Sequence, residues 1–132
     1  MAEPLDMFVV NVTDTIGTAM RKITVNRHRA VVVVDGKRVV GTVSDGDIRR
    51  AFLKEVLPIA PVEAIMNMNC RTTTERDPGR LSKLIHREQV TVLPVVDEAN
   101  ELLDVALAYE PFAHEADKLN RGTRSGEARS AA

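Results

Sequence analysis

The sequence predicts an α/β (α+β) fold made of two β-α-β-β-α repeats that pack with pseudo-twofold symmetry. Short valine-rich runs alternate with segments whose apolar residues recur at helical spacing. The order of these segments in the first half recurs in the second half, at an offset of about 62–65 residues. Each half is too small to bury its own sheet, so we expect the two halves to pack face to face.

Composition and charge narrow the class of protein. The 132 residues carry 18 basic and 19 acidic side chains, and only 3% are aromatic. This balance argues against a nucleic-acid partner, and no apolar run approaches the roughly 18 residues of a membrane span. The single Cys70 excludes an internal disulfide, and residues 1–12 lack the pattern of a signal peptide. We therefore expect a cytoplasmic protein.

The first repeat is expected over residues 1–57, and this range includes a loose arm at 1–7. Thr13 or Asp14 is the expected N-cap of its first helix, because both side chains can accept a hydrogen bond from a free backbone N–H. The expected elements are a strand at 8–10, a helix that contains positions 16–23, a buried strand at 30–34, a tight turn at 35–36, a strand ending at 43 and a helix ending near 56.

The stretch RVVGTVSDGDIRRAF carries the strongest functional pattern: strand, sharp turn, helix. Gly41 interrupts its apolar run, and a glycine inside a strand often marks the close approach of another backbone or a ligand. The turn SDGD then places a hydroxyl and two carboxylates beside unpaired N–H groups of a helix. Ser44 and Asp47 also fit a variant of the capping box. A cap and a ligand contact are compatible, so both interpretations stay open.

The second repeat is expected over residues 58–113, after a break with two prolines. Pro78 predicts the start of a helix, since its missing N–H costs nothing there. The other expected elements are a short helix at 62–66, a strand at 71–74, a strand at 90–96 and a strand at 102–108. Residues 114–132 lose apolar spacing and are expected to form a flexible tail.

Two groups of motifs carry a family resemblance. The first half has VVVVDG followed by VVGTVSDGDI, and the second has Ile65-Met66-Asn67 followed by LPVVD. These motifs resemble the tandem cystathionine-β-synthase (CBS) domain pair, or Bateman module, over about residues 8–112. The resemblance implies a regulatory homodimer that binds an adenine nucleotide (AMP, ADP or ATP) between its repeats and acts on a partner enzyme or transporter.

In this family a Ser or Thr three residues before an Asp contacts the nucleotide, which implies that role for Ser44 and Asp47. A carboxylate can accept from both ribose hydroxyls, and a hydroxyl can donate to a phosphate. The resemblance extends the expected ligand-binding set to Thr42, Asp45, His28, Arg29, Arg50, Val10, Asn11 and Ala30.

Each added residue also has a structural interpretation. Arg29 and Arg50 could pair with phosphate, or they could be solvated surface charges. His28 could lie near phosphate, or belong to a basic connection. The adenine candidates Val10, Asn11 and Ala30 could equally be core or edge residues.

The second half departs from the family pattern. Leu107 stands where the hydroxyl should be, Glu110 stands where the ribose carboxylate should be, and Asp104 replaces the glycine that matches Gly41. We therefore expect the second site to be lost or altered. This degeneracy favours the alternative of a structural dimerisation module that binds no ligand. The homodimer that the resemblance implies is consistent with an apolar surface at Ala51, Phe52, Val56 and Ile65.

Catalysis is not expected. Asp45 and Asp47 form a D-x-D pair that could hold a divalent metal for hydrolysis. However, no nucleophile–base pair and no phosphate-binding lysine loop accompanies them. The histidines share no metal-ligand spacing.

Overall fold

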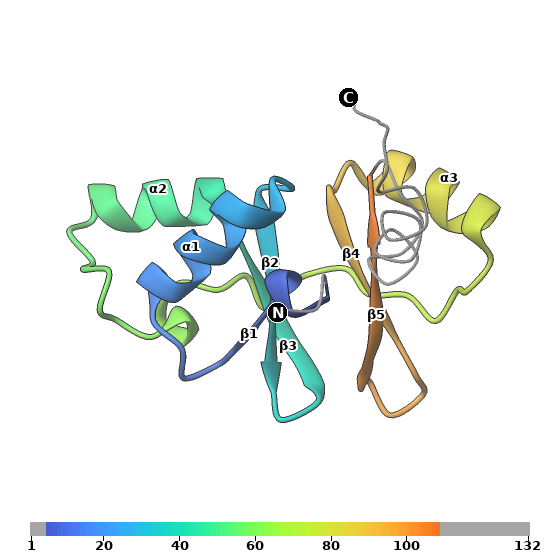
Figure 1. The fold of residues 1–132 in the computed structure, drawn as a ribbon, viewed down its shortest axis with the longest axis horizontal. Coiled ribbons are helices and arrows are strands. Elements are labelled where there is room, and N and C mark those ends of the chain that lie inside the picture. The colour runs from blue at the N-terminus through green and yellow to red at the C-terminus, as the bar shows by residue number, and fades with distance from the viewer. Residues whose placement is uncertain (1–4, 109–132) are drawn as a thin grey trace, which may run out of the picture.

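The first repeat has the expected β-α-β-β-α order (Figure 1). The computed structural model describes residues 5–108, so the predicted tail and Glu110 lie outside the described residues. The elements are η1 (Leu5–Phe8), β1 (Val9–Asn11), α1 (Ile16–Asn26), β2 (Ala30–Asp35), β3 (Arg38–Ser44) and α2 (Asp45–Leu53). Strand β2 is central, because it pairs with β1 in parallel and with β3 antiparallel.

The second repeat contains η2 (Val62–Ala64), α3 (Pro78–Glu88), β4 (Val92–Val96) and β5 (Leu102–Leu107). The expected helix at 62–66 is a single 3-10 turn. The expected strand at 71–74 is wrong, because only an isolated bridge joins Thr73 to Val95. Pro94 explains this difference: it lies next to the bridge in β4 and has no N–H to extend the ladder.

The repeats pack face to face, as the sequence predicts. Buried side chains from both sheets form one core, which contains Phe8, Val32, Val34, Val39, Val92, Val96, Val105 and Leu107. The two β-hairpins lie side by side at one end of the molecule (Figure 1). There Val39 N donates to Asn100 O at 3.1 Å, and Leu102 N donates to Lys37 O at 2.8 Å. The α+β fold with stacked halves is therefore confirmed.

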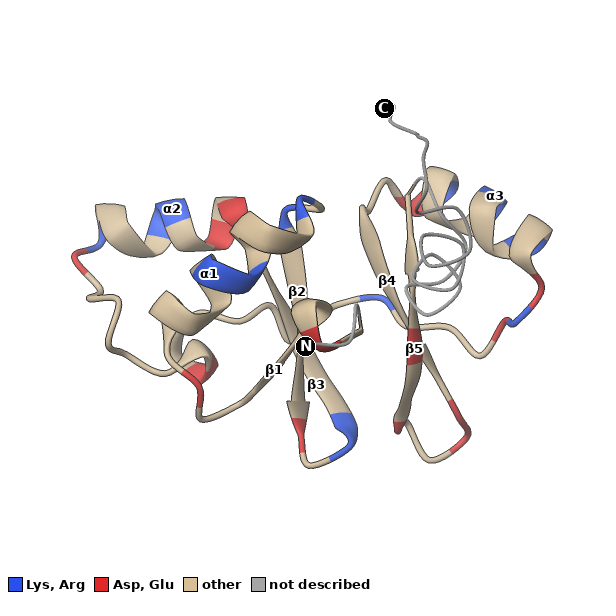
Figure 2. Cartoon of the chain, in the orientation of Figure 1, with Lys and Arg blue, Asp and Glu red and all other residues tan. Residues whose placement is uncertain are grey.

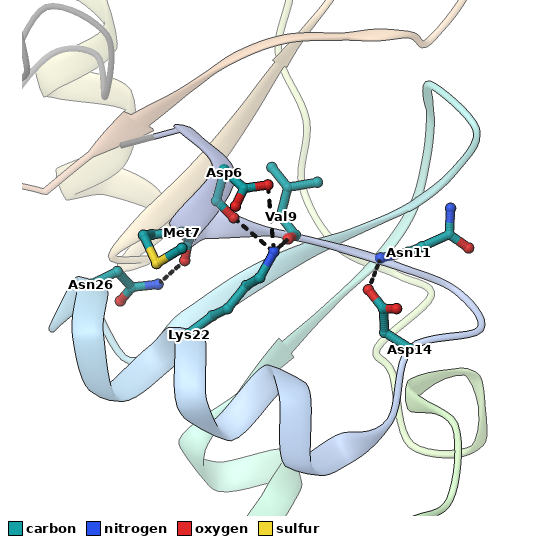
Figure 3. Close-up of polar contacts among 7 residues, drawn as sticks. All are labelled: Asp6, Met7, Val9, Asn11, Asp14, Lys22 and Asn26. Atoms are coloured by element: carbon teal, nitrogen blue, oxygen red, sulfur yellow. Dashed lines mark hydrogen bonds and ion pairs between the residues drawn. The ribbon is translucent and has the colours of Figure 1, made fainter. Parts of the chain in front are cut away.

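The predicted N-cap of α1 is wrong. The cap is Thr15, whose Oγ1 accepts from Thr18 N at 3.1 Å. The Asp14 carboxylate instead accepts from Asn11 N at 2.8 Å (Figure 3). The helix start is also fixed from outside the helix, because Ile16 N donates to Ala60 O at 2.9 Å.

The N-terminal segment Leu5–Phe8 is ordered, where the sequence predicted a loose arm. Two polar side chains of α1 hold its backbone (Figure 3). Lys22 Nζ donates to Asp6 O at 3.0 Å and to Val9 O at 2.8 Å. Asn26 Nδ2 donates to Met7 O at 2.8 Å. Because of these bonds, Phe8 is held in the core between the repeats, where it is 5% exposed.

The close approach predicted at Gly41 is confirmed. A Cβ on this residue would lie 2.9 Å from the backbone oxygen of Asn67. The next residue, Thr42, exchanges two backbone hydrogen bonds with Asn67, at 3.1 Å and 2.8 Å. The missing side chain thus lets the linker, which is residues 65–77 between η2 and α3, pair with β3. No helix within residues 5–108 is long and apolar enough to cross a membrane.

Candidate functional site

A cleft of about 850 Å³ lies between the two repeats. This volume is in the range of small-molecule sites, roughly 300–1,000 Å³. Three parts of the chain form its walls: the first repeat at the junction of β3 and α2, the linker, and the connection from α3 to β4. The lining residues are Arg29, Ala30, Thr42, Ser44, Asp45, Gly46, Asp47, Arg49, Arg50, Asn67, Asn69, Cys70, Arg71, Glu88, Gln89, Val90, Thr91 and Val92.

A complete capping box starts helix α2 at one wall of the cleft. Ser44 Oγ accepts from Asp47 N at 3.2 Å, and Ser44 N donates to Asp47 Oδ2 at 2.9 Å. The structural interpretation of these two residues is therefore correct. Both also line the cleft, so their oxygens lie beside the N-terminal end of the α2 dipole, where negative charge is favoured.

Arg29 brings positive charge to the same wall. Its backbone is in the left-handed region, with φ of 67°, and its carbonyl accepts from Asp45 N at 3.0 Å. This bond joins the start of β2 to the first turn of α2, where basic and acidic segments lie side by side (Figure 2). The Arg29 side chain is exposed and has no ion pair with any residue of 5–108. It is therefore available to an anion.

The opposite wall mixes a charged pair with a thiol. Arg71 Nε lies 3.1 Å from Glu88 Oε1, so this linker arginine is tied to the end of α3. Burial raises the pKa of the Cys70 thiol, with a backbone hydrogen bond acting in the other direction. Val90 and Val92 add apolar surface to this wall. The cleft can thus offer polar groups on one side and an apolar patch on the other.

The structure brings seven of the ten expected ligand-binding residues to the cleft: Arg29, Ala30, Thr42, Ser44, Asp45, Asp47 and Arg50. Three lie elsewhere. Val10 is 1% exposed in the core under α1. Asn11 accepts hydrogen bonds from the backbone and hydroxyl of Thr13 through Oδ1. His28 packs edge-on against Phe8, with ring centroids 5.5 Å apart.

Sequence reasoning missed the linker and the second-repeat wall of the cleft. One usable signal was the repeat itself, because Thr91 and Val92 are the counterparts of Arg29 and Ala30 at the 62-residue offset. Thr91 joins the repeats directly, since its hydroxyl donates to the backbone oxygen of His28. Asn67 belongs to the motif Ile65-Met66-Asn67 that carries the family resemblance, whereas Asn69 and Arg71 have no such signal.

Within residues 5–108, the second repeat buries a leucine where the first repeat has the Ser44 hydroxyl. Leu107, the counterpart of Ser44, is 2% exposed and belongs to the core that contains Phe8 and Val92. Phe8, from the N-terminal segment, is buried in the same core. Asp104 is buried and accepts from Val105 N at 2.8 Å. Residues 5–108 contain no group of three or more His, Cys, Asp or Glu that could hold a metal.

Comparison with known proteins identifies the first repeat. Residues 2–54 match the family described as CBS domain. An uncharacterised protein of Helicobacter pylori (strain J99 / ATCC 700824) is 32% identical over 78 residues, which are 58% of this chain and 24% of that protein. The chain thus spans about a quarter of the length of this relative.

Solved structures identify the fold of the whole described chain. A CBS domain protein from Pyrobaculum aerophilum complexed with AMP has a TM-score of 0.62 at 23% identity, covering 76% of this chain and 79% of that one. A CBS domain pair/ACT domain protein from Thermotoga maritima has a TM-score of 0.64 at 16% identity, covering 92% and 98%. CBSX2 in complex with AMP has a TM-score of 0.61 at 17% identity, covering 86% and 88%. The fold that the resemblance implies, that of a CBS domain pair, is therefore confirmed.

Proposed function

We propose that this chain is a regulatory module that senses an adenine nucleotide in the cleft between its CBS repeats. It works as a cytoplasmic homodimer, is not itself an enzyme, and transmits its state to a partner enzyme or transporter. The ligand acts by differential affinity: a nucleotide that bridges the repeats favours one arrangement of the module and shifts its population. Two structurally similar proteins were solved with AMP, which supports an adenine nucleotide as the ligand class.

The observation that carries the proposal is the convergence of Ser44, Asp47 and Arg29 in one cleft. The Asp47 carboxylate can accept from ribose hydroxyls. The Arg29 guanidinium can form a bidentate pair with phosphate oxygens. Ala30 and Val92 contribute apolar surface for a base. Because Leu107 is buried where the first repeat has Ser44, we expect one nucleotide per chain.

The test is calorimetric titration of the chain with AMP, ADP and ATP, together with thermal unfolding. A ligand at about 100 times its dissociation constant adds about 2.7 kcal/mol to the free energy of unfolding. Asp47→Asn keeps an acceptor for the capping box but removes the charge, and it should weaken binding at least about tenfold. Asp77→Asn is the matched control, because Asp77 also caps a helix but lies outside the cleft. It should leave the affinity unchanged.

A second candidate function is a structural dimerisation module that binds no ligand. It is favoured by apolar side chains exposed at the end of α2 and after it: Phe52 at 40%, Leu53 at 79%, Leu57 at 65% and Ile59 at 78%. Sedimentation with and without nucleotide separates the two functions. A stable dimer that shows no heat of binding with millimolar AMP, ADP or ATP supports the scaffold and contradicts the sensor.

A further inference from the structure

Arg50 lies directly on the carboxylate that the proposed function assigns to ribose. Its Nη2 donates to Asp47 Oδ1 at 2.7 Å, a short charge-assisted contact. The Arg50 side chain is 64% exposed, whereas that of Asp47 is 16% exposed. The guanidinium therefore covers the acid from the solvent side.

The other oxygen of Asp47 is already used. Oδ2 accepts from Ser44 N at 2.9 Å in the capping box, and breaking that bond would loosen the start of α2. A ribose must consequently approach Oδ1, where it meets Arg50. A sugar hydroxyl carries no charge, so exchanging the guanidinium for a ribose hydroxyl gives up the ion pair and the geometric match of Arg50 to the carboxylate.

The displaced guanidinium would stay close to the cleft. A Cβ on Gly46 would lie 3.3 Å from Arg50 Nη1 and 3.7 Å from Ser44 Oγ, so the guanidinium rests over the first turn of α2. This turn is where a bound phosphate would find N–H groups and the positive end of the helix dipole. Arg50 and Arg29 both line this part of the cleft.

We propose that Arg50 is a specificity-determining residue that makes ribose recognition depend on phosphate. It competes with a nucleoside for Asp47 Oδ1, and it exchanges that oxygen for a phosphate oxygen when a nucleotide binds. The cleft therefore discriminates against adenosine in favour of AMP. This inference rests on the proposed nucleotide site.

The test compares adenosine and AMP as probes, by calorimetry, on the unmodified chain and on Arg50→Ala. The variant should bind adenosine more tightly and AMP more weakly, so that the AMP-to-adenosine affinity ratio falls at least about tenfold. Arg80→Ala is the matched control. Arg80 is also an exposed arginine near a carboxylate, with 3.8 Å to Glu75, but it lies outside the cleft, and both affinities should stay unchanged.

The outcomes distinguish a failure of the proposed competition at Asp47 from a failure of the proposed nucleotide site. If AMP binds and Arg50→Ala leaves adenosine binding equal or weaker, the competition is refuted while the nucleotide site stands. If no protein binds AMP or adenosine at millimolar concentration, both proposals fail. Thermal unfolding checks that each variant is folded, and the loss of one exposed ion pair should leave the melting temperature almost unchanged.

Discussion

Replacing Gly41 with alanine should destabilise the protein more than any other single methyl group added at a described glycine. The new Cβ would lie 2.9 Å from Asn67 O, 3.1 Å from Met66 Sδ and 3.2 Å from Met66 Cγ. The methionine can move, but Asn67 O belongs to the backbone. Because that oxygen accepts from Thr42 N, any shift of the linker strains two hydrogen bonds to β3.

The expected cost follows from these contacts. Overpacking of a filled site costs about 1–3 kcal/mol. Each of the two backbone bonds between Thr42 and Asn67 contributes about 0.5–1.5 kcal/mol, and both weaken if the linker moves. We therefore expect Gly41→Ala to lower the free energy of unfolding by about 2–4 kcal/mol. The linker also forms one wall of the cleft, so nucleotide affinity should fall with it.

Urea denaturation followed by circular dichroism measures this change, with Gly17→Ala as the matched control. A Cβ on Gly17 would meet nothing closer than Pro58 O at 3.6 Å, which is an ordinary contact. Because alanine is the better helix former, that variant should be neutral or more stable by up to about 1 kcal/mol. Equal stability of Gly41→Ala and Gly17→Ala would refute the argument that the linker backbone is fixed against β3.

Three further predictions concern the contacts between the repeats. Phe8→Ala should lower the free energy of unfolding by about 3–5 kcal/mol in urea denaturation, since the ring fills the space beside Leu107; a loss below about 1 kcal/mol would mean that the site collapses. Thr91→Val removes the hydroxyl that donates to His28 O and should cost about 1 kcal/mol; an unchanged denaturation midpoint would contradict this bond. Alkylation of Cys70 by iodoacetamide should be slower than that of a free thiol at pH 7.5, because burial raises its pKa and lowers its thiolate fraction. The alkylation rate should rise as the pH approaches the raised pKa of Cys70. Saturating AMP should lower the alkylation rate further. A rate equal to that of glutathione, with or without AMP, would contradict the placement of Cys70 in the cleft.

The sequence predicted those parts of the fold that local patterns determine. The run AVVVV became the central strand β2, and the SDGD turn became the start of α2 with its capping box. Gly41 revealed a tertiary contact in advance, because only a missing side chain lets a second backbone come so close. In each case the residue type favours one local structure: valine favours a strand, the SDGD turn favours a helix start, and glycine allows a close approach.

The errors occurred where several residues were equally suitable locally. Thr13, Asp14 and Thr15 can all cap a helix, and hydrogen bonds to Asn11 and Ala60 decide among them. The linker wall of the cleft has no local pattern either. Its position depends on a bridge that spans about 25 residues of chain, from Thr42 to Asn67.

His28 shows the same limit at the site itself. The family resemblance placed it with Arg29 near phosphate. In the structure, Arg27 and Arg29 have φ values of 63° and 67°, so the backbone turns sharply on both sides of His28. The His28 ring packs on Phe8 while Arg29 lines the cleft. The adjacent residues His28 and Arg29 therefore lie in different environments, one against Phe8 and the other in the cleft.

Within residues 5–108, the two sides of the repeat interface differ in a similar way. On one side of the repeat interface, Ser44 and Cys70 leave open volume lined by polar groups. On the other side, Leu107, the counterpart of Ser44, and Phe8 are buried in the core that both sheets share. Burying a side chain such as Phe or Leu contributes about 1.5–3 kcal/mol, whereas an open polar cleft contributes no such burial. With so small a core in each repeat, the filled side stabilises the stacked arrangement that the open side requires to bind a ligand.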